Sequence, residues 1–146
     1  NSEGQIVLSG KTQDLEKLTE ILKKNSIKNI KLPVSAPFHC SLMGKATEIM
    51  IEELNKISFS DGHNTLISNV TAEAISNSED LKSLLIKQIE SRVRWRESVL
   101  NMINNDVDHF IEIGPGKVLS GLVKRINREV KINTLNSQED IENLKI

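Results

Sequence analysis

Apolar residues recur at a spacing of three and four positions in several segments of the chain. Such spacing lines one face of an α-helix with apolar side chains. The pattern predicts helices at residues 12–24, 41–56, 81–88, 95–103 and 118–126, and a last, frayed helix over 137–146. We expect Thr12 to cap the first helix, and Ser78 or Asp80 to cap the third, because short polar side chains satisfy the free N–H groups at a helix start.

Short apolar runs between these segments predict strands at residues 5–8, 30–34, 65–70, 107–113 and 130–135. Ile30, Leu32 and Val34 alternate with other residues, which is typical of a half-buried strand. Pro37 fixes its own backbone and favours an extended conformation at the residue before it, so this strand should end in a rigid corner. Strands and helices follow one another along the chain, which indicates the α/β fold class.

Charge and cysteine content exclude several classes of function. The 146 residues include 19 Lys and Arg against 20 Asp and Glu, so no net field attracts nucleic acid or an anionic membrane. No apolar run approaches the roughly 20 residues that a membrane-spanning helix needs. Cys40 has no second cysteine to pair with in this chain. A single cysteine fits a reducing compartment, and we expect the cytoplasm.

The histidine after the predicted corner is the strongest candidate for chemistry. His39 lies where a strand should end and a helix should begin. The positive end of a helix dipole favours the neutral imidazole, which can accept a proton from a hydroxyl nucleophile. A histidine in this position can also serve only as a helix cap or a surface residue, and the residues by themselves leave both interpretations open.

Several short motifs occur in a fixed order and together resemble one family. They are Asn1-Ser2-x-Gly4-Gln5, Ser35-x-Pro37-x-His39-Cys40-x-Leu42-Met43, Ser68-Asn69-Val70, Val93-x-Trp95, and Glu112-Ile113-Gly114-Pro115-Gly116-Lys117-Val118-Leu119. In this order they resemble the malonyl-CoA:acyl carrier protein transacylases of bacterial fatty-acid synthesis. More broadly, they resemble the acyltransferase domains of fatty-acid and polyketide synthases.

The resemblance implies that the chain is the C-terminal half of a longer enzyme. The family's nucleophilic serine lies on a Gly-x-Ser-x-Gly elbow, and no such motif occurs here. Residues 1–34 would be the second half of a ferredoxin-like small subdomain. Residues 35–146 would be the C-terminal part of the large, α/β-hydrolase-like acyltransferase subdomain.

The resemblance also implies a mechanism and site residues. A serine would carry malonyl from malonyl-CoA to the phosphopantetheine thiol of acyl carrier protein, with His39 as general base and with no metal or other cofactor. The family orients this histidine through a backbone carbonyl at a glutamine, which counting along the chain places at Gln88. Asn1 and Gln5 would border the substrate cleft, although Gln5 can equally be scaffolding.

Two alternatives remain open at this stage. The chain could be a piece of a polyketide synthase acyltransferase domain. It could also be a non-catalytic docking fragment for acyl carrier protein, whose acidic surface would need a basic face such as Lys117, Lys124, Arg125 and Arg128. That spacing also suits an ordinary solvated helix. Lys117 follows two glycines without the spacing of a phosphate loop, and His63 and His109 have no partners at metal-ligand spacing.

Overall fold

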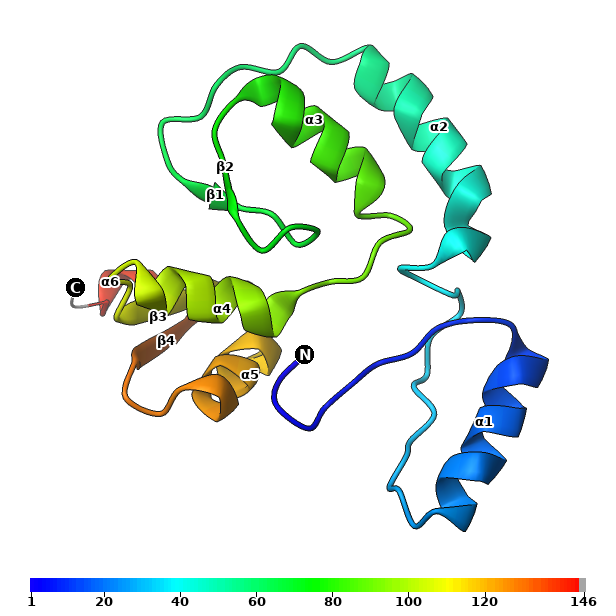
Figure 1. The fold of residues 1–146 in the computed structure, drawn as a ribbon. Coiled ribbons are helices and arrows are strands. Elements are labelled where there is room, and N and C mark those ends of the chain that lie inside the picture. Colours follow the sequence, from blue (N-terminus) through cyan, green and yellow to red (C-terminus); the bar gives the residue numbers. More distant parts are fainter. Residues whose placement is uncertain (145–146) are drawn as a thin grey trace. The chain divides into compact units, whose positions relative to one another are not determined.

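A computed structural model describes residues 1–144 as alternating helices and short strands (Figure 1). In chain order these are α1 (Thr12–Lys24), the 3₁₀ helix η1 (Ser41–Met43), α2 (Gly44–Asn55), β1 (Leu66–Ile67), β2 (Ala74–Ile75), α3 (Ser78–Lys87), α4 (Trp95–Asn104), β3 (His109–Ile113), α5 (Val118–Ile126), β4 (Lys131–Leu135) and α6 (Gln138–Glu142). The α/β class predicted from the sequence is confirmed.

The chain divides into two compact units. Unit 1 comprises residues 1–6 and the chain from Arg94 onward, and unit 2 comprises residues 7–93. This division describes how the chain packs with itself. The predicted subdomains, 1–34 and 35–146, describe a correspondence with a longer enzyme, and that correspondence stays a prediction.

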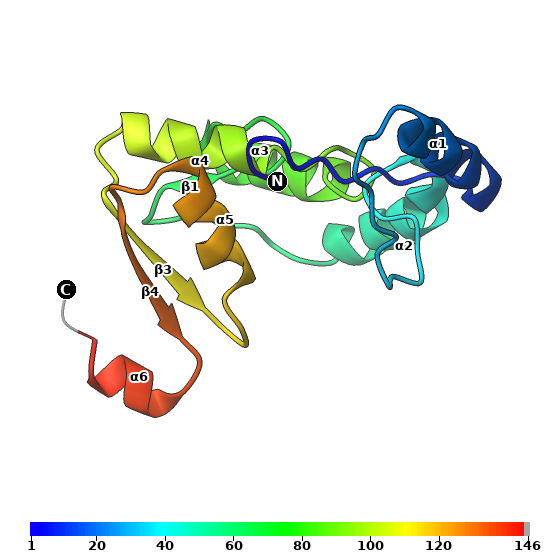
Figure 2. The ribbon, with the colours of Figure 1, turned by 90° about the horizontal axis from the view of Figure 1, so that it is seen from below.

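Unit 1 is built on a parallel pair of strands, β3 and β4, that lie side by side (Figure 2). Their register runs from His109 opposite Lys131 to Ile113 opposite Leu135, and α5 forms the crossover between them. The core of this unit contains Val99 of α4, which is fully buried, together with Val123 and Val130. The helical periodicity of α4 and α5 is therefore explained by burial of one face of each helix.

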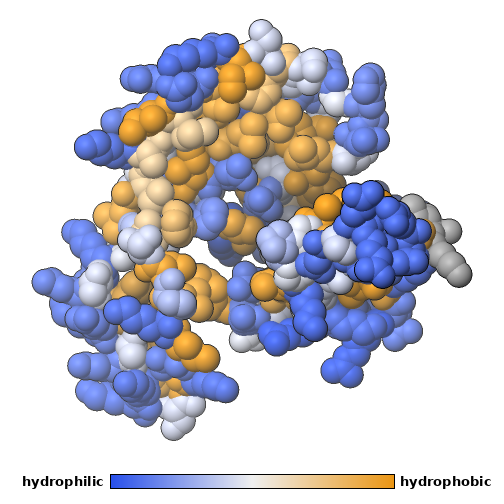
Figure 3. Space-filling model, turned by 180° about the vertical axis from the view of Figure 1, so that it is seen from behind, coloured by the Kyte–Doolittle hydropathy of each residue, from blue (hydrophilic) through white to orange (hydrophobic). Residues whose placement is uncertain are grey.

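Unit 2 contains α1, η1, α2, the antiparallel pair of β1 and β2, and α3. The chain between the two strands folds back on itself, because Ser68 exchanges backbone hydrogen bonds with Ala72 (2.8 Å) and Glu73 (2.9 Å). Leu54 of α2 and Ala72 are its buried apolar residues. Many other apolar side chains reach the surface, as the orange areas of Figure 3 show, among them Ile49, Met50 and Ile51 of α2.

Two of the predicted strands are wrong. Residues 5–8 and 30–34 have no strand in the structure, and their side chains are mostly exposed, with Ile6 81% and Ile30 75% accessible. An alternating side-chain pattern supplies only half of what a strand needs, since the backbone groups must also pair with a neighbouring strand. Within the described residues neither segment forms such a ladder, and Gln5 instead closes a turn onto Ser2.

The helix boundaries also correct some predicted details. Lys11, not Thr12, is the N-cap of α1. Asn77 caps α3 by accepting a hydrogen bond from the backbone N–H of Asp80 at 2.8 Å, so the prediction of Ser78 or Asp80 as the cap is wrong. The helix predicted over 41–56 begins with the 3₁₀ turn η1. The strand predicted over 65–70 shortens to β1, and the last two residues of the predicted C-terminal helix, 145–146, lie outside the described part of the chain.

Candidate active site

The corner before η1 presents His39 in an unusual backbone conformation. Its φ of 62° lies in the left-handed region, where histidine is one of the residues that occur more often than average. The thiol of Cys40 donates to the backbone carbonyl of Pro37 at 3.2 Å, which closes the turn around the histidine. His39 itself is exposed. His39 thus lies, exposed, in the turn that follows Pro37, although the strand expected before this turn is absent.

The end of α3 supplies a partner for this ring. Nδ1 of His39 lies 3.0 Å from the backbone carbonyl oxygen of Gln88, the C-cap residue of α3. A carbonyl oxygen can only accept a hydrogen bond, so Nδ1 is the donor in this contact. In a neutral imidazole with this tautomer, Nε2 is the nitrogen with a free lone pair. The contact expected from the family resemblance is present. The catalytic role of both residues stays a prediction.

A third segment reaches the same place. The side-chain amide of Asn69 donates to Oε1 of Gln88 at 3.4 Å, so the side chain and the carbonyl of Gln88 face different partners. Asn69 lies in the folded-back loop between β1 and β2, next to Ser68, which is buried. Asn69 belongs to the Ser68-Asn69-Val70 motif that the family resemblance rests on. In the structure its side chain contacts the residue whose backbone carbonyl is bonded to the His39 ring.

A second contact ties the same two segments together, and sequence reasoning missed it. The hydroxyl of Thr47, in the first turn of α2, donates to Oε1 of Glu90 at 2.6 Å. Glu90 lies two residues after Gln88, in a turn whose backbone N–H bonds back to Lys87 of α3. Neither residue belongs to a motif or an apolar repeat, so the sequence carried no signal for this pair.

Asn1 and Gln5, the two expected cleft residues, lie in unit 1, whereas His39 and Gln88 lie in unit 2. Oε1 of Gln5 accepts hydrogen bonds from Ser2 (3.3 Å) and Arg125 (3.1 Å). These contacts attach the start of the chain to α5, which favours the scaffolding interpretation of Gln5. A role in binding substrate stays a prediction for both residues.

The basic face expected for a docking fragment is partly engaged within the chain. Arg125 binds Gln5, and Nζ of Lys124 donates to the backbone carbonyl of Arg128 at 2.7 Å. Cations that already have partners are poorer anchors for an acidic surface, since those contacts must be exchanged. The structure therefore gives no added support to the docking alternative.

The N-terminus of α5 is occupied by a carboxylate from the preceding strand. Glu112 accepts from the backbone N–H of Leu119 at 3.1 Å and of Ser120 at 2.7 Å. The side chain and backbone of Ser120, with the backbone of Leu119, hold the pKa of Glu112 below its ordinary value. These two N–H groups at the start of α5 are therefore already used and are not free to bind a phosphate.

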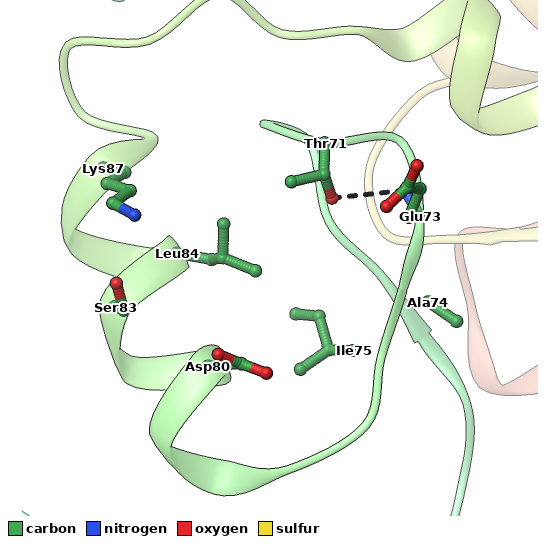
Figure 4. A pocket seen from close by; sticks show the side chains of 8 residues that line it. All are labelled: Thr71, Glu73, Ala74, Ile75, Asp80, Ser83, Leu84 and Lys87. Carbon is green, nitrogen blue, oxygen red and sulfur yellow. Dashed lines mark hydrogen bonds between the residues drawn. The ribbon is translucent and has the colours of Figure 1, made fainter.

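A cavity of about 240 Å³ lies beside α3 but away from the histidine (Figure 4). Its wall contains Ile75 of β2 and Leu84 of α3, together with polar side chains from α3 and from the loop before β2. Neither His39 nor Gln88 lines it. The cavity is therefore not part of the candidate site.

His109 is engaged within the strand pair, with Nε2 2.7 Å from Oδ1 of Asn133. Among residues 1–144, no group of three or more His, Cys, Asp or Glu side chains is arranged to hold a metal ion. No helix in this part of the chain is long and apolar enough to cross a membrane.

Comparison with known proteins identifies close relatives. Malonyl CoA-acyl carrier protein transacylase of Bacillus subtilis is 45% identical over 143 residues, which are 97% of this chain and 45% of the relative. The chain thus spans about half the length of the curated relatives it matches. No family model matches the chain.

Solved structures agree with the sequence relatives. The crystal structure of acyl-carrier-protein-S-malonyltransferase from Bartonella henselae matches with a TM-score of 0.86 and 39% identity, over 91% of this chain and 43% of that one. A malonyl-transacylase solved in complex with a type II PKS acyl-carrier protein matches with a TM-score of 0.85 and 30% identity, over 91% of this chain and 43% of that one. By sequence and by fold, this chain is a homologue of the malonyl CoA-acyl carrier protein transacylases that spans a little under half of their length.

Proposed function

We propose that this chain is the histidine-bearing, C-terminal half of a malonyl-CoA:acyl carrier protein transacylase that acts in the cytoplasm. The observation that carries the proposal is the hydrogen bond between Nδ1 of His39 and the backbone carbonyl of Gln88. It leaves Nε2 free to accept a proton, as a general base requires. The homology to transacylases over 97% of the chain supports the choice of reaction.

In the first half of the proposed reaction, a serine hydroxyl attacks the thioester carbonyl of malonyl-CoA. Nε2 of His39 takes the hydroxyl proton, the carbon–sulfur bond breaks, and the CoA thiolate leaves with that proton. In the second half, the phosphopantetheine thiol of acyl carrier protein attacks the malonyl-serine ester. His39 accepts the thiol proton and returns it to the serine oxygen. The serine comes from a part of the enzyme that this chain does not cover, because the chain contains no Gly-x-Ser-x-Gly elbow.

The proposed chemistry requires no metal and no electron-carrying cofactor, since it exchanges one ester for another without oxidation or reduction. The partners are a coenzyme A thioester and acyl carrier protein. The relative that was solved together with an acyl-carrier protein supports the second of these. The same residues would serve in a polyketide synthase domain, but the homology to stand-alone transacylases favours fatty-acid synthesis.

A chimera provides the test. In it, this chain replaces the matching 143 residues of the Bacillus subtilis relative, and transfer of labelled malonyl from malonyl-CoA to acyl carrier protein is measured. We expect transfer, and a decrease in kcat of about 10²- to 10⁴-fold in the variant His39→Ala. His63→Ala, at an exposed position, is the matched control and should retain the parent rate. A folded chimera without transfer, or full activity in His39→Ala, would overturn the proposal.

A further inference from the structure

The segment that carries His39 and the segment that carries Gln88 come together at one end of two helices. The 3₁₀ turn η1 and the start of α2 follow His39, and α3 ends at Gln88 (Figure 1). The histidine contact joins a turn to the end of a helix, and His39 is exposed. A single hydrogen bond in contact with water contributes little by itself, because water competes for both partners. The ring therefore needs further support if one orientation is to dominate.

The pair Thr47 and Glu90 is placed to supply that support. Their hydrogen bond of 2.6 Å has a charged acceptor, and both side chains are half-buried. Hydrogen bonds to ionised groups are the stronger class. Thr47 lies in the first turn of the helix that follows His39, and Glu90 lies two residues after Gln88. The pair thus fixes the distance between the two backbone segments whose separation decides whether Nδ1 reaches the carbonyl.

The backbone around Glu90 is suited to transmit this constraint. The N–H groups of Ile89 and Glu90 bond to the carbonyls of Ile86 (3.3 Å) and Lys87 (3.3 Å), so the turn is continuous with α3. On the other side, α2 begins directly after η1, with Met43 bonded to Cys40 at 3.0 Å. A shift of Glu90 relative to Thr47 would therefore move the Gln88 carbonyl relative to the imidazole.

We propose that Glu90, through Thr47, is a positioning residue that selects the Nδ1–H tautomer of His39. The importance of this effect for catalysis rests on the proposed function. The effect itself, on the tautomer of the imidazole ring, does not. The proposal implies that the ratio of the two His39 tautomers depends on the hydrogen bond between Thr47 and Glu90, although neither residue is bonded to the ring or to the Gln88 carbonyl.

The test is nuclear magnetic resonance of the imidazole nitrogens in the chimera, labelled with ¹⁵N in histidine. Long-range ¹H–¹⁵N spectra distinguish Nδ1–H from Nε2–H, and comparison with the variant His39→Gln identifies the signals of His39. We expect Thr47→Val and Glu90→Ala each to raise the ratio of Nε2–H to Nδ1–H at His39 by about fivefold, the population change that one net hydrogen bond produces. Glu90→Gln, which retains an acceptor oxygen, should stay close to the parent ratio.

Matched controls separate this effect from general loosening of the fold. Thr19→Val removes the hydroxyl of another half-buried helical threonine. Glu53→Ala removes a carboxylate of α2 that is bonded to Lys56, the C-cap residue of the same helix. Both should leave the His39 signals unchanged. An unaltered ratio in Thr47→Val, or equal changes in Glu90→Ala and Glu90→Gln, would overturn the proposal. Because the readout needs no turnover, it is independent of whether the chimera transfers malonyl.

Discussion

Nδ1 of His39 lies 3.0 Å from the backbone carbonyl oxygen of Gln88, although 49 positions separate the two residues in the chain. Every residue presents a main-chain carbonyl, so the acceptor depends on where α3 ends and not on the chemistry of glutamine. The glutamine side chain has a different partner, the amide of Asn69. The backbone of Gln88 therefore binds the histidine, whereas its side chain binds the loop between β1 and β2.

Replacing the side chain of Gln88 should therefore have a modest effect. In the chimera, Gln88→Ala keeps the carbonyl and loses the bond to Asn69, so we expect kcat to fall by no more than about fivefold, the effect of one net hydrogen bond. His39→Ala, measured alongside, sets the scale of a lost base. Loss of all transfer in a Gln88→Ala protein with a normal circular dichroism spectrum would show that the side chain itself is required.

The isolated chain should not accept malonyl from malonyl-CoA. Cys40 is the side chain most able to attack a thioester, but its thiol is half-buried and donates to the carbonyl of Pro37. Intact-mass measurement before and after incubation should give the same value. An added malonyl group, mapped to any residue, would contradict the proposal that the nucleophile lies outside this chain.

Helices were predictable from the sequence because both their apolar repeat and their backbone hydrogen bonds join residues only three or four positions apart. The spacing of Trp95, Val99 and Met102 identified α4, and Val99 is fully buried on the predicted face. Strands depended on partners that the pattern does not reveal. Residues 30–34 alternate as a strand does but form no strand ladder among the described residues. By contrast, no pattern in the sequence predicted β2, which is only two residues long.

The candidate site was predictable only in part. That His39 lies in a turn before a helix followed from Pro37 and the apolar repeat after it, but its link to Gln88 came from the family resemblance. No local rule connects residues 49 positions apart. The bond between Thr47 and Glu90 was beyond reach for the same reason, since it joins ordinary polar residues across 43 positions.

Glu112 should make the stability of unit 1 depend on pH. Its hydrogen bonds to Ser120 and Leu119 hold its pKa below the ordinary value of 4.5. A carboxyl group with a lowered pKa in the folded state contributes stability above its unfolded-state pKa, and this contribution is lost as the pH falls through the folded-state pKa. At pH 7, Glu112→Gln should therefore unfold at a lower urea concentration than the parent. The difference should shrink in acid.

Urea titrations at several pH values, followed by circular dichroism, check this expectation. Glu129→Gln removes an exposed carboxylate in the same unit and should show no comparable difference from the parent. A Glu112→Gln deficit that is the same at pH 7 and in acid would assign the effect to packing and not to the charge.

The core of unit 1 should be sensitive to the loss of a single side chain at Val99. Val99→Ala removes two methyl groups from a site with no exposed surface and leaves a cavity between α4, α5 and the residues beside them. We expect the free energy of unfolding to fall by about 2 kcal/mol, from lost burial and the cavity together. Val118→Ala makes the same change at a position that is 72% exposed, and should alter stability by less than about 0.5 kcal/mol.

Urea unfolding followed through the fluorescence of Trp95, which packs against this core cluster, measures both variants in the same unit. Equal effects at the two valines would mean that this cluster is not the core that stabilises unit 1.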